Sequence, residues 1–431
     1  MQHSALARGF MCGIVFGIAC GLPWTLASDA FAAETRASES ERARPRFVVQ
    51  DLEAQANAGD AEAMFRLAQA LQRGRGVKED DARAAEWYLR AAENGHAAAM
   101  TNLGVMYSRG EGVARDDGRA IEWYRKGAAA GSTKAMVMLG TRAAQGQGVA
   151  QDGTEALSWY REAAAKGDET AMYLAGTALL RSSDSDDLAE AHRWLRAAGD
   201  AGHAPALTAL GTAHLEGKGV ERNAPEAMRL FRAAAALGDA NAMANLGVAH
   251  LDGLGAAQDM KEGVRWLRGA AALGDARALT KFGDLHRLGT AAPEVPLDLG
   301  AAFACYSEAA ELGFVPAMAH VGAMLVDGKG TARDEERGVE WLERAADAGV
   351  PEAMLNLAGC YRDGRGVDQN HATAYFWAAA GAGRVGEPLR EGAERFASRI
   401  GESITFQRRL AVKKRIEEWS FAQVDSARGV E

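Results

Sequence analysis

A period of about 36 residues runs through most of this 431-residue chain and restricts its possible folds more than any other feature. Glycines end the successive units at Gly59, Gly95, Gly131, Gly167, Gly202, Gly238, Gly274, Gly313, Gly349 and Gly383. The spacings between them are 36, 36, 36, 35, 36, 36, 39, 36 and 34 residues. A fixed period in this range is typical of a solenoid in which pairs of helices stack on one another.

Each unit contains two amphipathic segments on either side of a glycine-rich turn. In the second unit, Leu103 and Tyr107 lie one helical turn apart in the first segment, and Ala120 and Tyr124 do so in the second. Gly110 opens the turn between them, because glycine enters the left-handed region without steric penalty. We therefore expect two helices of about 12 residues in each unit.

An aspartate or asparagine precedes every second segment, where its side chain can accept hydrogen bonds from the free amides of a helix N-terminus. The nine expected caps are Asp80, Asp116, Asp152, Asp187, Asn223, Asp259, Asp298, Asp334 and Asn370. Alternating runs of Val, Ile and Thr, which would indicate strands, are absent. The sequence predicts an all-α chain built from nine helix-turn-helix units.

Composition divides the rest of the chain into shorter segments. The start resembles an export signal, because Arg8 precedes an uncharged apolar run and Ala30-Phe31-Ala32 offers a cleavage site. The expected divisions are a signal peptide at 1–32, a disordered tether at 33–45, an N-terminal capping helix at 46–58, nine repeats at 59–383, C-terminal capping helices at 384–421 and a disordered tail at 422–431.

Two fates of the N-terminal segment stay open. Cleavage would give a periplasmic or secreted protein without stable membrane insertion, which we expect to be a monomer. Residues 9–28 are also long enough to span a bilayer, and their glycines recur every four residues as in packed membrane helices. An uncleaved segment would anchor the protein in the inner membrane as a dimer.

Charge and cysteines restrict the possible partners. The net charge of −9 comes from interspersed acids and bases, which argues against a nucleic-acid groove. Cys305 and Cys360 replace packed positions of the repeat, so we expect buried free thiols. The most basic cluster lies near the C-terminus and is either a solvated face or a site for an anionic partner. Its members are Arg408, Arg409, Lys413, Lys414 and Arg415.

The second unit carries the motif A-x-x-x-L-G-x-x-Y-x-x-G-x-G-V-x-x-D-x-x-x-A-x-x-W-Y-x-x-A from Ala99 onward, with Gly127 at its last position. This motif resembles the Sel1-like repeat family, relatives of tetratricopeptide repeats, over about residues 59–383. The resemblance implies a right-handed α-solenoid whose first helices line the concave side, and a scaffold role. Exported bacterial members include regulators of signalling receptors, envelope assembly factors and host-interaction proteins.

Catalytic signatures are missing from the sequence. It contains no S-x-x-K, G-x-S-x-G or H-E-x-x-H motif, and its one G-x-G-x-x-G, at 381–386, follows a helical pattern instead of a strand. Cysteine-rich members of the family have been credited with acting on penicillins, but this chain lacks their repeated cysteine pair. We expect a non-enzymatic protein without a cofactor; the alternative is an enzyme acting on cell-wall or β-lactam substrates.

Three histidines hold the place of Tyr107 in successive units: His214, His250 and His286. Packed helices stand about 8–10 Å apart, whereas zinc ligands lie about 2 Å from the ion, so all three could hardly share one metal. We expect structural histidines and no metal site, with a pH-sensitive joint as the alternative.

Partner recognition is best sought at the residue before the Leu-Gly pair, which faces the concave groove by analogy with tetratricopeptide repeats. Asparagine there offers a donor and an acceptor to a peptide backbone, although it can equally bridge adjacent repeats. The candidates for binding another protein or peptide are Arg66, Asn102, Asn245, Lys281, His320 and Asn356 at this position, with Arg109 and Arg362 nearby.

Overall fold

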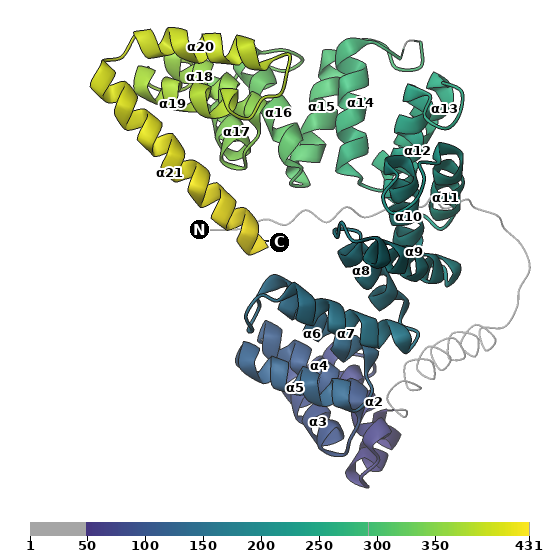
Figure 1. Cartoon of the computed structure of the whole chain (residues 1–431). Helices are drawn as coiled ribbons and strands as arrows, with labels where there is room; N and C mark the ends of the chain where they lie inside the picture. The colour runs from purple at the N-terminus through teal and green to yellow at the C-terminus, as the bar shows by residue number, and fades with distance from the viewer. Residues whose placement is uncertain (1–48, 292, 431) are drawn as a thin grey trace, which may run out of the picture. The chain divides into compact units, whose positions relative to one another are not determined.

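The computed structural model describes residues 49–291 and 293–430, with side chains as far as Trp419. The export signal and tether predicted for residues 1–45 lie outside the described residues. Within the described part, helices joined by short turns account for nearly all of the chain (Figure 1). None of these helices has the length and apolarity needed to cross a bilayer. The chain divides into two compact units, Met1–Trp123 and Tyr124–Glu431.

The first unit begins with helical residues 49–57, inside the predicted capping helix. They precede α2 (Ala61–Arg73), α3 (Asp81–Glu93) and α4 (Ala97–Arg109), and α5 (Asp117–Ala129) starts here. Leu67, Tyr88 and Leu103 are buried in one core that joins these helices.

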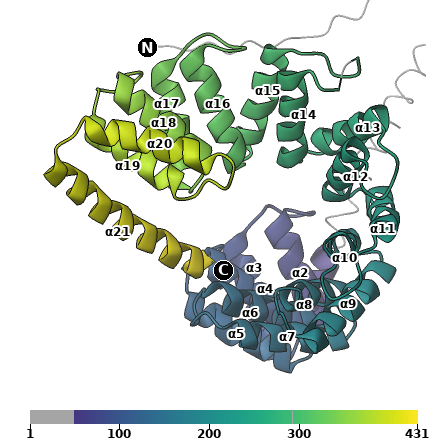
Figure 2. The ribbon, with the colours of Figure 1, turned by 45° about the horizontal axis from the view of Figure 1, so that its top comes forward.

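The second unit continues the alternation of first and second helices (Figure 2). Its helices are α6 (Thr133–Gln145), α7 (Gly153–Ala165), α8 (Glu169–Leu179), α9 (Ser185–Asp200), α10 (Ala204–Glu216), α11 (Ala224–Ala236), α12 (Ala240–Asp252), α13 (Met260–Ala272), α14 (Ala276–Leu288), α15 (Leu299–Glu311), α16 (Val315–Asp327), α17 (Glu335–Asp347), α18 (Pro351–Asp363), α19 (His371–Ala382), α20 (Arg390–Glu402) and α21 (Phe406–Val430). The two helices of a repeat pack together in α2 and α3 and in every pair from α6 and α7 to α18 and α19, as the sequence predicts.

Eight of the nine predicted caps accept a backbone N–H at the start of the second helix. The prediction is wrong for Asp187. Asp184 caps α9 instead, and its carboxylate accepts the N–H groups of Asp186 and Asp187 at 2.8 and 3.1 Å. The fourth repeat lacks the Gly-x-Gly turn, so α8 shortens to 11 residues and α9 starts earlier and reaches 16.

Where a repeat has the Gly-x-Gly turn, its second glycine contacts the preceding second helix, and we call this contact the repeat junction. Gly330 has φ +73°, and a Cβ there would lie 2.0 Å from the carbonyl oxygen of Leu299 in the preceding second helix. Gly366 lies in the same way against Glu335, at 2.3 Å. The turns therefore need glycine both for the backbone conformation and for the close approach of the two backbones.

The glycine of the Leu-Gly pair admits a large side chain from the second helix. A Cβ on Gly283 would lie 2.6 Å from Cε1 of Tyr306, and Gly140 stands in the same relation to Tyr160. The tyrosine of the Trp-Tyr pair is the more deeply buried partner, since Tyr88 is 0% exposed and Trp87 is 9% exposed. The tyrosine ring is thus the main anchor of the helix pair.

The insertion in the seventh repeat folds back onto the core. Ala291 and Val295 form an isolated antiparallel bridge, and both side chains are buried in the same cluster as Phe282. Cys305 and Cys360 are free thiols as predicted, but only Cys360 is fully buried.

The prediction of a disordered tail at 422–431 is wrong for most of its length, because α21 continues to Val430. No proline interrupts this stretch, and alanine, glutamine and arginine favour the helix.

Candidate partner-binding site

All the candidate binding residues lie on first helices. In the second unit, neighbouring first helices contact each other at α6–α8, α8–α10, α10–α12 and α16–α18, and contacts between successive second helices are weaker. The first helices therefore form the inner side of the stack from α6 to α12 and again at α16 and α18. We call the exposed surface of α6, α8, α10, α12, α14, α16 and α18 the first-helix face.

The structure distributes the candidates over both units. Arg66, Asn102 and Arg109 lie in the first unit, and Asn245, Lys281, His320, Asn356 and Arg362 lie in the second. Asn245 and Lys281 are half-buried on α12 and α14. Asn356 and Arg362, both on α18, line one pocket together.

Asn102 contacts a tyrosine of the preceding repeat. Its side chain hydrogen-bonds the hydroxyl of Tyr88, which itself donates to Oε1 of Gln72 at 3.0 Å. Burial is the main reason that the pKa of Tyr88 is raised. Asn102 thus joins α3 to α4, which is the bridging alternative that the sequence left open.

His320 holds the same position and also contacts a tyrosine of the preceding repeat. Its ring stacks on Tyr306, with centroids 4.4 Å apart. The Tyr306 hydroxyl donates to Oδ1 of Asp284 at 2.8 Å and accepts from Nε of Arg287 at 3.2 Å. Burial lowers the pKa of His320 and raises that of Tyr306, so both side chains are neutral at pH 7.

The two arginine candidates of the first unit are ion-paired. Nε of Arg66 lies 2.6 Å from Oε1 of Glu62, and the side chain is 63% exposed. Nη1 of Arg109 lies 3.5 Å from Glu111. Exposed pairs of this kind contribute little to stability and remain accessible to a partner.

A pocket of about 170 Å³ opens on the first-helix face between α16, α17 and α18. Leu342 and Leu355 supply apolar walls, and the exposed Asn356 and the half-buried Arg362 supply polar groups. This volume is smaller than that of a typical small-molecule site, which starts at about 300 Å³. The pocket fits one side chain of a protein partner, with an amide and a guanidinium beside it.

Arg365 orders the charged edge of this pocket. Its Nη2 donates to the carbonyl of Val326 at 2.6 Å and lies 3.0 Å from Oδ1 of Asp327. Hydrogen bonds from Lys329, and then from Arg365, lower the pKa of Asp327 and keep it ionised. Sequence reasoning missed Arg365 and Asp327, because they are 38 residues apart and belong to different repeats.

The remaining polar groups of the pocket do not form a catalytic arrangement. Burial raises the pKa of Cys360 to about 11, so its thiol stays protonated at neutral pH and is a poor nucleophile. Arg362 is held by Asp363 at 2.6 Å, and its guanidinium lies 5.3 Å from the centre of the Phe396 ring. The pocket can bind and orient a partner, and no described group in it is prepared to act as a nucleophile.

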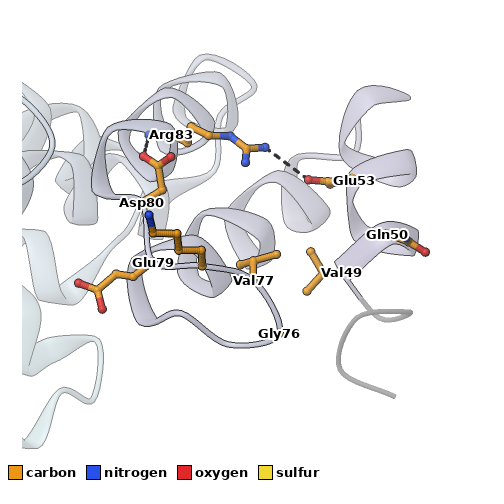
Figure 3. Close-up of a pocket in the computed structure, with 9 residues that line it drawn as sticks. Val49, Gln50, Glu53, Gly76, Val77, Glu79, Asp80 and Arg83 are labelled. Carbon is orange, nitrogen blue, oxygen red and sulfur yellow. Dashed lines mark hydrogen bonds and ion pairs between the residues drawn. The ribbon is translucent and has the colours of Figure 1, made fainter. Parts of the chain in front are cut away.

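A second, larger pocket of about 470 Å³ lies at the start of the first unit (Figure 3). Val49 and Val77 face each other across it, and Nη2 of Arg83 lies 3.4 Å from Glu53 at its edge. Gly76, which lines it, is the turn glycine of the first repeat. The pocket therefore lies between the helical residues 49–57 and the turn of the first repeat, and none of the candidate binding residues lines it.

The three recurring histidines lie in different surroundings. Both ring nitrogens of His214 are buried without a hydrogen-bond partner in the described part of the chain. His250 is buried, and Nδ1 of His286 lies 3.1 Å from the carbonyl oxygen of Pro296. No group of three His, Cys, Asp or Glu side chains among the described residues is arranged to hold a metal ion.

Among these three histidines, His214 is the one whose protonation the fold disfavours. Burial, and then the neighbouring imidazole of His192 with its centroid 5.9 Å away, lower the pKa of His214. Glu226 acts in the opposite direction, and the charges of Arg196 and Arg229 add to the lowering.

We expect the free energy of unfolding to fall as pH drops below about 6.5, the ordinary histidine pKa. Below that pH the imidazole of residue 214 is protonated in the unfolded chain, whereas the fold disfavours its protonation. Above that pH His214 has no such effect. His214→Tyr, which restores the residue type of the second repeat, should make the loss shallower in urea titrations between pH 7.5 and 5. Equal slopes in the wild-type protein and the variant would contradict the expectation.

Comparison with known proteins identifies the repeat. The model of the Sel1 repeat matches nine times, at residues 61–96, 97–132, 133–168, 170–203, 204–239, 240–275, 276–314, 315–350 and 351–382. These boundaries agree with the periods read from the glycines.

Two solved structures and one curated protein resemble the chain. A Sel1 repeat protein from Oxalobacter formigenes has 29% identity and a TM-score of 0.55, covering 72% of this chain and 92% of that one. A protective antigen of uropathogenic Escherichia coli with an SLR fold has 23% identity and a TM-score of 0.52, covering 89% and 97%, and shows the fold alone. The chitin synthase regulator SKT5 of Saccharomyces cerevisiae is 36% identical over 80 residues, which are 18% of this chain and only 12% of the regulator.

Proposed function

Because this chain belongs to the Sel1 repeat family, whose members bind other proteins and are generally non-catalytic, we propose that it is a scaffold or regulator of the bacterial cell envelope. In this proposal it is exported after signal cleavage, and its partner lies on the first-helix face. The pocket that joins Asn356 to Arg362 is the observation that carries the proposal.

The first-helix face suits a protein partner for two physical reasons. The packed helices hold the pocket in advance, so binding costs little ordering entropy. Asn356 offers a donor and an acceptor, and the adjacent Leu355 and Leu342 can cover an apolar side chain. The name of the yeast regulator supports a regulatory role, although the matched segment is a small part of that protein.

A photo-reactive phenylalanine analogue at Asn356, expressed in the native host, should give a discrete cross-linked adduct with one envelope protein. Arg362→Ala should reduce that adduct by about tenfold, since a charge-assisted hydrogen bond contributes roughly 1.5–3 kcal/mol. The matched control places the analogue at Glu340, an exposed position on the second helix α17. Equal adducts from both positions, or none from Asn356, would exclude the first-helix face as the binding surface.

A further inference from the structure

The last helix of the ninth repeat, α19, and the helices α20 and α21 that follow it lie at the C-terminal end of the second unit (Figure 1). A cavity of about 430 Å³ lies between these three helices. Small residues leave it open on α19 and α20, among them Ala379, Ala382 and Ala397. At Gly401 a Cβ would lie 3.0 Å from Cε2 of Tyr375 and 3.7 Å from Cδ of Arg409, so the bare glycine lets these side chains approach. The volume falls in the range of about 300–1,000 Å³ that is typical of ligand sites.

Two cations of α21 line this cavity on one helical face. Arg409 and Lys413 are four residues apart, and neither forms an ion pair with any described residue. Nε of Arg409 is buried and has no hydrogen-bond partner in the part of the chain that the structure describes. A buried donor without an acceptor costs free energy, so an acceptor that enters the cavity would recover that cost.

The part of the lining that α20 supplies carries an acceptor and a hydroxyl. Glu394 and Ser398 line the cavity one turn apart, and Glu394 is not ion-paired with either cation among the described residues. The ionised groups that line the cavity are therefore two positive charges and one negative charge. A ligand that presents a carboxylate next to N–H groups matches this set, and a peptide has both.

We propose that this cavity binds the carboxylate of a peptide segment, with Arg409 and Lys413 holding the carboxylate and Glu394 accepting a peptide N–H. The carboxylate belongs either to a peptide C-terminus or to an Asp or Glu side chain. The site is independent of the first-helix face, so one can fail without the other. It also gives a specific role to part of the basic cluster that the sequence places near the C-terminus.

Calorimetric titration of the full chain with three peptides tests the proposal. The probes are acetyl-tetra-alanine with a free C-terminus, the same peptide with an amidated C-terminus, and amidated acetyl-Ala-Glu-Ala-Ala. Binding of the first or third identifies the source of the carboxylate, and the amidated tetra-alanine should not bind. The proposal is overturned when neither carboxylate peptide binds, or when the amidated tetra-alanine binds equally well.

The variant R409Q/K413Q should weaken binding by about tenfold or more, because it removes both charge-assisted hydrogen bonds. The control R408Q/K414Q makes the same change in net charge at exposed positions of the same helix; Lys414 is 78% exposed and pairs with Glu418. Equal weakening in both variants would mean attraction by net charge alone and would refute the site. Ser398→Trp, at an exposed position on the cavity wall, provides a second test, since it should block binding while leaving the circular dichroism melt unchanged.

Discussion

Gly330→Ala should disrupt the junction between the seventh and eighth repeats. The added Cβ would lie 2.0 Å from the carbonyl oxygen of Leu299, where neither backbone can move without separating the repeats. The substitution also places alanine at a φ of +73°, which costs about 1–2 kcal/mol by itself. Forced overpacking adds roughly 1–3 kcal/mol or more, so we expect a total loss of several kcal/mol.

The position that separates these two penalties is Gly349, which has a φ of +94° and open space where a Cβ would lie. Gly349→Ala should therefore lose only the conformational part, about 1–2 kcal/mol. Urea titration followed by circular dichroism compares the two variants, and hydrogen exchange locates the damage. Because each repeat of a solenoid is stabilised by its neighbours, faster exchange should concentrate in α15 to α18. Equal losses in both variants would contradict the close approach at Gly330.

Tyr306→Ala should be the most destabilising truncation in the seventh repeat. The ring is fully buried against Gly283 and stacks on His320, and removal of a large aromatic side chain from a core costs about 3–5 kcal/mol. Because Tyr306 contacts both its own first helix and the next one, its loss should weaken two repeats together.

Tyr306→Phe is the matched variant, since it keeps the ring and removes only the hydroxyl. Asp284 and Arg287 still lie 3.2 Å from each other without it, so the expected loss is about 1 kcal/mol. Chemical denaturation of the three proteins at pH 7 measures both differences. A phenylalanine variant as unstable as the alanine variant would show that the hydrogen bonds, and not the ring, anchor this helix pair.

The repeat pattern is strong enough to predict most of the fold without a structure. The period, the helix pairs and eight caps follow from positions within one unit, where spacing along the chain determines spacing along a helix. The fourth repeat shows where this reasoning ends. Because this repeat lacks the glycine turn, its alignment with the other repeats places the cap at Asp187. In the structure the carboxylate of Asp184, three residues earlier, accepts the backbone N–H groups instead.

At the candidate site, the sequence predicts individual residues but not the contacts between them. The sequence identifies Asn356 and Arg362 as candidates because they occupy chosen positions of a repeat. It contains no signal that Arg365 meets Asp327, or that Asn102 and His320 contact the tyrosine of the preceding repeat. Each of these contacts joins neighbouring units, and the period alone does not specify how the units stack.

The sequence by itself determined the class of the protein, the number of its repeats and the residues that build each helix pair. Those features depend on periodicity and capping, which act over a few neighbouring residues. Only the tertiary structure decided which side chains meet across repeats, how Ala291 and Val295 return the insertion to the core, and that α21 closes a cavity around Arg409. Such contacts depend on the approach of helices that are distant in sequence, and packing in three dimensions fixes that approach.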